Sequence, residues 1–203
     1  MQTDKKGRAV IFAAAPGGEY SFFTPLEGDY IICADRGYTY ARKLGIVPDY
    51  LLGDFDSIEE PLPEGIPIET FPAEKDEKDL QLAISHALSK GYREIYVLGA
   101  IGGRVDHFLG NIGLIRWTKD RGGILSMEDA DTYICPVFGE AVFQKRPNRY
   151  FSVLPFYGDA VISVTGTKYT ATRAKIAAGD TLGISNEITE DAAKVCCESV
   201  TKP

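Results

Sequence analysis

Two aspartates that follow an apolar run are the residues in this sequence best suited to chemistry. They lie in the segment Leu-Leu-Gly-Asp-Phe-Asp-Ser over residues 51–57. If the backbone stays extended, Asp54 and Asp56 point to the same side. Adjacent carboxylates repel each other, and a hard cation such as Mg²⁺, bound through oxygen, removes that repulsion. The segment is therefore a candidate metal site at the end of a strand, with a solvated turn as the alternative.

A second candidate is the charged run over residues 74–79, Glu-Lys-Asp-Glu-Lys-Asp. Its functional interpretation makes Asp79 a further metal ligand and Lys75 a phosphate contact. The alternative is a solvated helix start, in which acidic residues favour the helix dipole and Asp76 is the N-cap.

A third candidate is the glycine-rich segment over residues 99–107, Gly-Ala-Ile-Gly-Gly-Arg-Val-Asp-His, which is followed by Asn111. A glycine turn between a strand and a helix exposes backbone N–H groups to an anion. Arg104, His107 and Asn111 share one predicted helix face, which suits a phosphate-bearing ligand, and Asp106 lies off this stripe and could turn to the metal. A tight turn with His107 bonded to backbone is the alternative.

These segments alternate with predicted strands and helices in the first 120 residues. Strands are expected over residues 8–15, 30–34, 50–53, 66–71 and 94–98, and helices over residues 36–44, 76–90 and 105–119. Such alternation predicts an α/β fold, a mostly parallel Rossmann-like sheet with flanking helices. From residue 124 onward short β-like runs, over residues 132–138, 141–144, 150–156, 160–164 and 181–184, predict a smaller all-β sandwich. The expected domains are residues 1–122 and 123–203.

The composition is that of an ordinary globular chain, with 44% hydrophobic and 25% charged residues. A formal net charge of −7 argues against a nucleic-acid groove or an anionic membrane surface as partner. The four cysteines lack metal-site spacing, and we find no signal peptide and no apolar run of membrane-spanning length. A reducing, cytoplasmic location is the simplest expectation.

Taken in order, the motifs resemble the thiamine pyrophosphokinase (thiamine diphosphokinase) family. The motifs that carry the resemblance are ADRG at 34–37, GIVPDYLLGDFDS at 45–57, FPAEKDEKD at 71–79, GAIGGRVDH at 99–107 with Asn111, and GISNE at 183–187. The resemblance implies transfer of a pyrophosphoryl group from ATP to the hydroxyl of thiamine, giving thiamine diphosphate and AMP. It also implies an N-terminal nucleotide-binding catalytic domain, a C-terminal thiamine-binding β-sandwich, and a homodimer with thiamine between the subunits.

The resemblance also implies roles for individual residues. Asp54, Asp56, Asp79 and Asp106 would form the catalytic acidic Mg²⁺ site, with Asp35 close by. Arg104 and Lys75 would hold phosphates, and His107 and Asn111 would complete the ATP side. Ser185 and Asn186 would lie at the thiamine site.

Two departures from the family pattern bear on these roles. Lys78 stands where the family commonly has Thr, which puts the shape of the metal site in question. The single tryptophan, Trp117, lies in an N-terminal helix, so thiamine must stack on Tyr or Phe, and Tyr169 is the first choice.

Two other functions remain open at the level of sequence. One is a pyrophosphokinase of the same fold that acts on another alcohol, such as a pterin. The other is a nucleotide- or thiamine-binding regulator without catalytic activity. The complete acidic set argues against the regulator, because binding alone does not need so many carboxylates.

Overall fold

The computed structural model describes residues 7–56, 58, 61–71 and 78–201. The chain divides into two compact units, residues 1–136 and 137–203. No helix among these residues is at once long and apolar enough to cross a membrane.

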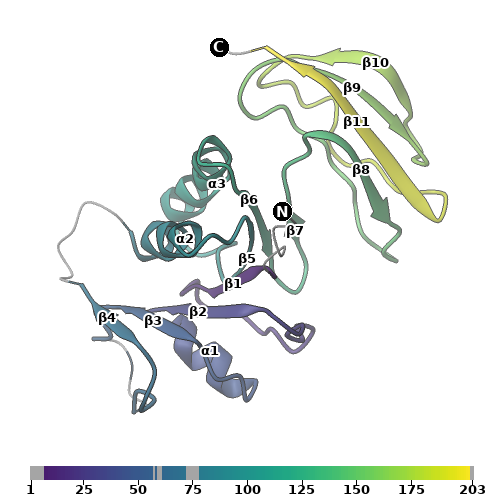
Figure 1. Cartoon of the computed structure of the whole chain (residues 1–203). Helices are drawn as coiled ribbons and strands as arrows, with labels where there is room; N and C mark the ends of the chain where they lie inside the picture. Colours follow the sequence, from purple (N-terminus) through teal and green to yellow (C-terminus); the bar gives the residue numbers. More distant parts are fainter. Residues whose placement is uncertain (1–6, 57, 59–60, 72–77, 202–203) are drawn as a thin grey trace, which may run out of the picture. The chain divides into compact units, whose positions relative to one another are not determined.

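The first unit is built on a seven-stranded sheet (Figure 1). Its strands are β1 Ala9–Phe12, β2 Tyr30–Ala34, β3 Tyr50–Gly53, β4 Ile68–Thr70, β5 Glu94–Leu98, β6 Ile124–Glu128 and β7 Tyr133–Ile134. Their order across the sheet is β4-β3-β2-β1-β5-β6-β7, and all pairs are parallel except β6 with β7. Strands β1 and β3 are buried along their whole length, as expected for a sheet covered on both faces.

Helices cover both faces of this sheet. The helices are α1 Gly37–Lys43, α2 Asp79–Ser89 and α3 Val105–Asp120. Figure 1 shows α2 and α3 on one face of the sheet and α1 on the other. Side chains from α2 and α3 share one hydrophobic cluster, whereas Tyr38, Tyr40 and Ala41 of α1 belong to the other. The helix expected over residues 76–90 corresponds to α2, in which Leu80, Ala83, Ile84 and Ala87 are all buried and form one apolar stripe.

The order of the strands creates a switch point at the centre of the sheet. From β1 the chain builds outward through β2, β3 and β4, and then it returns to β5 on the other side of β1. The loops after β1 and β5 therefore leave in different directions at the carboxyl edge. Open α/β sheets bind ligands in this position.

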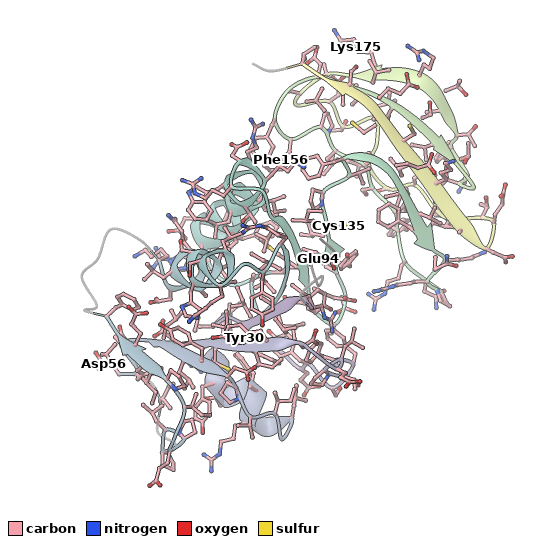
Figure 2. The ribbon with its side chains drawn as sticks, viewed as in Figure 1. Tyr30, Asp56, Glu94, Cys135, Phe156 and Lys175 are labelled. Carbon is pink, nitrogen blue, oxygen red and sulfur yellow. The ribbon has the colours of Figure 1, made fainter. Side chains whose placement is uncertain are left out.

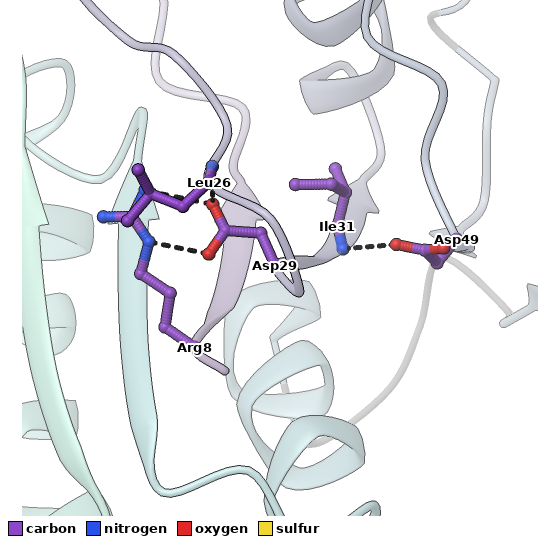
Figure 3. A network of polar contacts seen from close by, with 5 residues as sticks. All are labelled: Arg8, Leu26, Asp29, Ile31 and Asp49. Atoms are coloured by element: carbon purple, nitrogen blue, oxygen red, sulfur yellow. Dashed lines mark hydrogen bonds and ion pairs between the residues drawn. The ribbon is translucent and has the colours of Figure 1, made fainter. Parts of the chain in front are cut away.

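The amino ends of the strands are fixed at the opposite edge by the carboxylates of Asp29 and Asp49 (Figure 3). Asp29 accepts hydrogen bonds from the Arg8 guanidinium at 2.9 Å and from the Leu26 N–H at 2.8 Å. Asp49 accepts the Ile31 N–H at 2.7 Å. These bonds tie the start of β1 to the turn before β2, and β2 to the residue before β3, so the frame that carries the carboxyl-edge loops is rigid.

The division between the units lies after Pro136, whereas the sequence placed it after Gly122. The reason is that β6 pairs in parallel with β5, and Leu125 and Met127 are completely buried in the first unit. No strand was expected over residues 124–128, and the segment was placed with the β-like runs of the second unit.

The second unit contains a four-stranded antiparallel sheet, which confirms the expected change from α/β to all-β. Its strands are β8 Gly139–Gln144, β9 Ala160–Thr165, β10 Ala171–Ile176 and β11 Ala192–Val200, in the order β10-β9-β11-β8. Its core consists of Ala160, Ile162, Val164, Ile176 and Val195. The sequence did not predict β10 or β11. The strands expected over residues 150–156 and 181–184 are replaced by one bridge between Phe151 and Asn186.

Candidate active site

Three carboxylates meet at the carboxyl edge of β2 and β3. Asp35 follows β2 directly, and its Oδ1 accepts the N–H of Asp54, the residue after β3, at 3.0 Å. Asp79, the first residue of α2, shares a side-chain hydrogen bond with Asp35. Asp35 therefore links residues from two strand ends and a helix start.

The Asp35 carboxyl is held in a state in which ionisation is disfavoured. Burial, followed by the hydrogen bond and the charge of Asp79, raises the pKa of Asp35 to about 7, although the Asp54 N–H works in the opposite direction. Acidic groups this close share a proton or bind a cation, because their negative charges otherwise repel.

Gly53 is the residue that permits this arrangement. Its φ is +146°, and a Cβ at this position would lie 1.8 Å from Oδ1 of Asp35. Any side chain would displace the carboxylate that accepts the Asp54 N–H. Glycine is thus required by both backbone conformation and space.

Asp56 is placed by a turn rather than by continued strand. Phe55 has a φ of +58°, and the Asp56 N–H donates to Oδ1 of Asp54 at 3.2 Å. The expectation that an extended backbone aims both aspartates to one side is therefore wrong. Asp54 is half-buried and Asp56 is exposed beyond the end of β3 (Figure 2).

The donor set suits Mg²⁺, which binds oxygen ligands and usually retains several waters. Across the described part of the chain, no group of three or more His, Cys, Asp or Glu side chains is arranged so that it could hold a metal ion. The fit to a cation rests instead on the hydrogen-bonded Asp35–Asp79 pair with Asp54 beside it. Two carboxylates with water and phosphate oxygens are a usual environment for this ion.

The glycine-rich turn after β5 lies at the switch point. Gly99, Gly102 and Gly103 have φ values of +78°, +87° and +70°. Asn111 donates from Nδ2 to the Ala100 carbonyl at 2.9 Å, so this side chain braces the turn. The predicted helix after the turn is confirmed as α3, which begins at Val105.

Arg104 and Asp106 form an ion pair with each other. Their closest atoms, Nη2 and Oδ2, are 2.6 Å apart, and both side chains are mostly exposed. The hydrogen bond from Arg104 lowers the pKa of Asp106, and the backbone N–H of His107 bonds to the same carboxylate. His107 is exposed on the first turn of α3.

In the second unit, the Asn186 side chain is bonded to the backbone of Tyr169. Its Oδ1 accepts the Tyr169 N–H at 3.0 Å, and its Nδ2 donates to the Tyr169 carbonyl at 2.7 Å. Oδ1 also accepts the Glu187 N–H at 2.9 Å. The structure thus brings Asn186 and Tyr169 together, and the Tyr169 side chain remains exposed, with a relative exposure of 64%.

Ser185 lies beside this pair in a left-handed conformation, with φ of +60°, and its N–H donates to Oγ of Ser152 at 3.1 Å. Its side chain is exposed. Of the remaining predicted residues, Lys75 lies outside the residues that the structure describes.

Sequence reasoning missed the loop after β1 and the residue after β6. The Ala15 N–H donates to the Gly99 carbonyl at 3.0 Å, and Tyr40 donates its hydroxyl to the Ala15 carbonyl at 2.9 Å. Asp129 accepts the Gly99 N–H at 3.2 Å. The loop after β1 could have been found from the glycine pair at residues 17–18, because this pair follows an apolar strand, as the Gly99 turn does.

Comparisons with known proteins agree for both units. Residues 26–124 match the family model "Thiamin pyrophosphokinase, catalytic domain", and residues 141–200 match "Thiamin pyrophosphokinase, vitamin B1 binding domain". A thiamine pyrophosphokinase of Bacillus subtilis is 38% identical over 166 residues, covering 77% of each chain.

Solved structures give the same result. A crystal structure of thiamine pyrophosphokinase from Bacillus subtilis has a TM-score of 0.86 and 31% identity, covering 97% of this chain and 95% of the other. A thiamin pyrophosphokinase from Geobacillus thermodenitrificans has a TM-score of 0.79 and 26% identity, covering 96% and 94%.

Proposed function

Because the chain belongs to the thiamine pyrophosphokinase family, we propose that Asp54, Asp56 and Asp79 are its catalytic, metal-binding carboxylates. The chain is an ATP-dependent thiamine diphosphokinase, which transfers the pyrophosphoryl group of ATP to the hydroxyl of thiamine. The products are thiamine diphosphate and AMP. Neither a pterin pyrophosphokinase nor an inactive regulator is favoured by these relatives.

The observation that carries the assignment of the site is the contact of Asp35 with both Asp54 and Asp79. It gathers acidic oxygens at the strand ends, beside the switch point where α/β sheets bind ligands. When bound, Mg²⁺ supplies charge neutralisation to the phosphates and a template for the in-line transfer. Asp35 supports this group by fixing the Asp54 backbone through its carboxylate.

The transfer itself needs alignment and charge stabilisation more than covalent help. The hydroxyl oxygen of thiamine forms a bond to the β-phosphorus of ATP. The bond from that phosphorus to the α,β-bridging oxygen breaks, and AMP leaves with its electron pair. One of the site carboxylates takes the hydroxyl proton, which is the reason that they must be ionised and exposed to substrate.

The phosphates of ATP are assigned to the turn after β5 and the start of α3. Solvent screens an exposed ion pair such as Arg104 with Asp106, so the pair contributes little and its partners are readily exchanged. In this proposal Arg104 turns to a phosphate and Asp106 is released toward the metal. His107 and Lys75 add positive or hydrogen-bonding groups, and Asn111 acts by bracing the turn.

Thiamine is assigned to the second unit. Its cationic, flat rings suit the exposed aromatic face of Tyr169. Ser185 contributes an exposed hydroxyl next to it. The side-chain amide of Asn186 is hydrogen-bonded to the Tyr169 backbone. Its role in binding is therefore to hold Tyr169 rather than to contact thiamine.

The assembly is proposed to be a cytoplasmic C₂ homodimer that binds thiamine between its subunits. The hydrophobic cluster of the small second unit contains five buried apolar residues in the part of the chain that the structure describes, and a partner subunit would cover more of this unit. Light scattering is expected to give twice the mass of one chain. A monomer with full activity would contradict this assembly.

A panel of acceptors tests the activity. The protein is incubated with ATP and Mg²⁺ together with thiamine, a hydroxymethyl pterin or no alcohol, and AMP is measured by chromatography. AMP should form in the sample that contains thiamine and not in the samples with the pterin or without an alcohol. Formation with the pterin would support the other pyrophosphokinase, and binding of thiamine without any AMP would support the regulator.

A further inference from the structure

The backbone of the turn after β5 is held at four points. The Gly99 carbonyl accepts the Ala15 N–H at 3.0 Å, and the Ala100 carbonyl accepts Nδ2 of Asn111 at 2.9 Å. The remaining two bonds go to one side chain. Asp129 accepts the N–H of Gly99 at 3.2 Å and also that of Ile101.

The position of Asp129 follows from strand register. Leu98 of β5 lies opposite Glu128 of β6, so the residues that follow them, Gly99 and Asp129, leave the sheet side by side. The Asp129 N–H donates to the Thr132 carbonyl at 2.9 Å, which fixes the aspartate itself. The carboxylate is therefore anchored by its own turn while it holds the neighbouring one.

The turn has little room to move on its other side. A Cβ at Gly99 would lie 2.5 Å from the Ala13 carbonyl oxygen and 3.0 Å from the Tyr20 hydroxyl. The Tyr20 side chain is almost completely buried. The loop after β1 and the carboxylate after β6 thus hold Gly99 from its two neighbouring strands.

We propose that Asp129 is a positioning residue that fixes the glycine turn in the conformation that receives the phosphates of ATP. The inference rests on the proposed function, in which this turn and Arg104 bind ATP. By occupying the amides of Gly99 and Ile101, Asp129 leaves the second half of the turn, residues 102–104, to face the ligand. A turn that is already ordered loses less conformational freedom when ATP binds.

If Asp129 positions the turn for ATP, its loss should affect the binding of ATP and not that of thiamine. A residue that only satisfies buried amides makes no such distinction between the two substrates. Loss of the carboxylate leaves two N–H groups without their acceptor, and the first half of the turn then competes with residues 102–104 for its conformation. The affinity for ATP should fall, whereas thiamine, assigned to the other unit, should bind as before.

The test compares Asp129→Ala and Asp129→Asn with wild type by steady-state kinetics. We expect Asp129→Ala to raise the KM for ATP about tenfold, as expected for the net loss of one to two hydrogen bonds to a charged acceptor. The KM for thiamine should stay within about twofold. Asp129→Asn keeps one acceptor oxygen and should recover part of the loss.

Asp120→Asn is the matched control, because this aspartate forms an exposed ion pair with Arg116 at 2.8 Å on α3. It should leave both constants unchanged. An unchanged KM for ATP in Asp129→Ala, or an equal rise for both substrates, would overturn the inference. If Asp129→Ala does not fold, an Asn variant identical to wild type would also overturn it.

A separate measurement distinguishes failure of the inference from failure of the proposed function. Calorimetric titration of the same variants with ATP and Mg²⁺ needs no turnover. If wild type forms no AMP from ATP and thiamine, the proposed function fails. Weaker ATP binding by Asp129→Ala in that titration would still support the positioning role, and equal binding would refute it.

Discussion

Replacement of Gly53 by alanine should disrupt the site through its contact with Asp35. The added Cβ would lie 1.8 Å from Oδ1 and 2.7 Å from Cγ of Asp35. The Asp35 backbone nitrogen also lies 3.1 Å from the added Cβ. The Asp35 side chain must therefore rotate away, and its hydrogen bond from the Asp54 N–H is lost. A hydrogen bond to a charged acceptor contributes about 1.5–3 kcal/mol, and positive-φ strain adds about 1–2 kcal/mol.

Gly45→Ala is the matched control for strain alone. Gly45 has a φ of +71°, and a Cβ there would meet nothing within 4 Å. Urea unfolding should show a loss of about 1–2 kcal/mol for Gly45→Ala and about 2.5–5 kcal/mol for Gly53→Ala. Displaced carboxylates should lower kcat at least about tenfold in Gly53→Ala only. Equal stability and equal kcat in the two variants would refute the role assigned to Asp35.

Three further perturbations test other parts of the account. Asp54→Asn and Asp56→Asn should each lower kcat by about 10²-fold or more without changing the unfolding midpoint; near wild-type turnover in both would leave the segment a mere turn. Tyr169→Ala should raise the KM for thiamine by a few-fold to about thirty-fold, equivalent to roughly 0.5–2 kcal/mol, with the KM for ATP unchanged; a change in the ATP constant instead would refute the assignment. Burial raises the pKa of Asp129 to about 6, above the ordinary value of an aspartate. The folded state therefore binds the extra proton below about 6 and loses stability as the pH rises through this value. Asp129→Asn removes this dependence, and its unfolding free energy relative to wild type should therefore increase from pH 4 to pH 7; a constant difference would count against the burial of this charge.

Much of the first unit could be predicted because its local signals agree with its tertiary structure. Helix α2 ends at Ser89, within one residue of the expected end, and strands β1, β2, β3 and β5 are apolar runs followed by turn residues. The placement of residues 124–128, which form β6, in the second unit has a different cause. The sequence of a five-residue strand does not indicate which strand it pairs with. The parallel pairing of β6 with β5 is defined only in the folded sheet.

The site was predictable in its residue types and less so in its geometry. The positive φ of Phe55 breaks the extended backbone that an apolar run ending in Asp54 suggests, because a non-glycine residue rarely adopts this conformation. The contact between Asp35 and Asp79 joins segments 44 residues apart, so no spacing rule could indicate it.

The second unit was the least predictable. Strands β10 and β11 contain many exposed polar side chains, such as those of Arg173 and Lys194, and so lack a clear apolar alternation. The link between Asn186 and the Tyr169 backbone depends on a loop that brings two distant turns together. The sequence pointed to both residues but not to the bond between them.

The products of the reaction with labelled ATP test the central claim most directly. The protein is incubated with ATP carrying ³²P at the β-position, in the presence and absence of thiamine and of Mg²⁺, and the products are separated by chromatography. The account predicts labelled thiamine diphosphate and an equal amount of unlabelled AMP, only when thiamine and the divalent metal are both present. Labelled ADP as the thiamine-dependent product, or AMP formation that persists in a metal chelator, would contradict it.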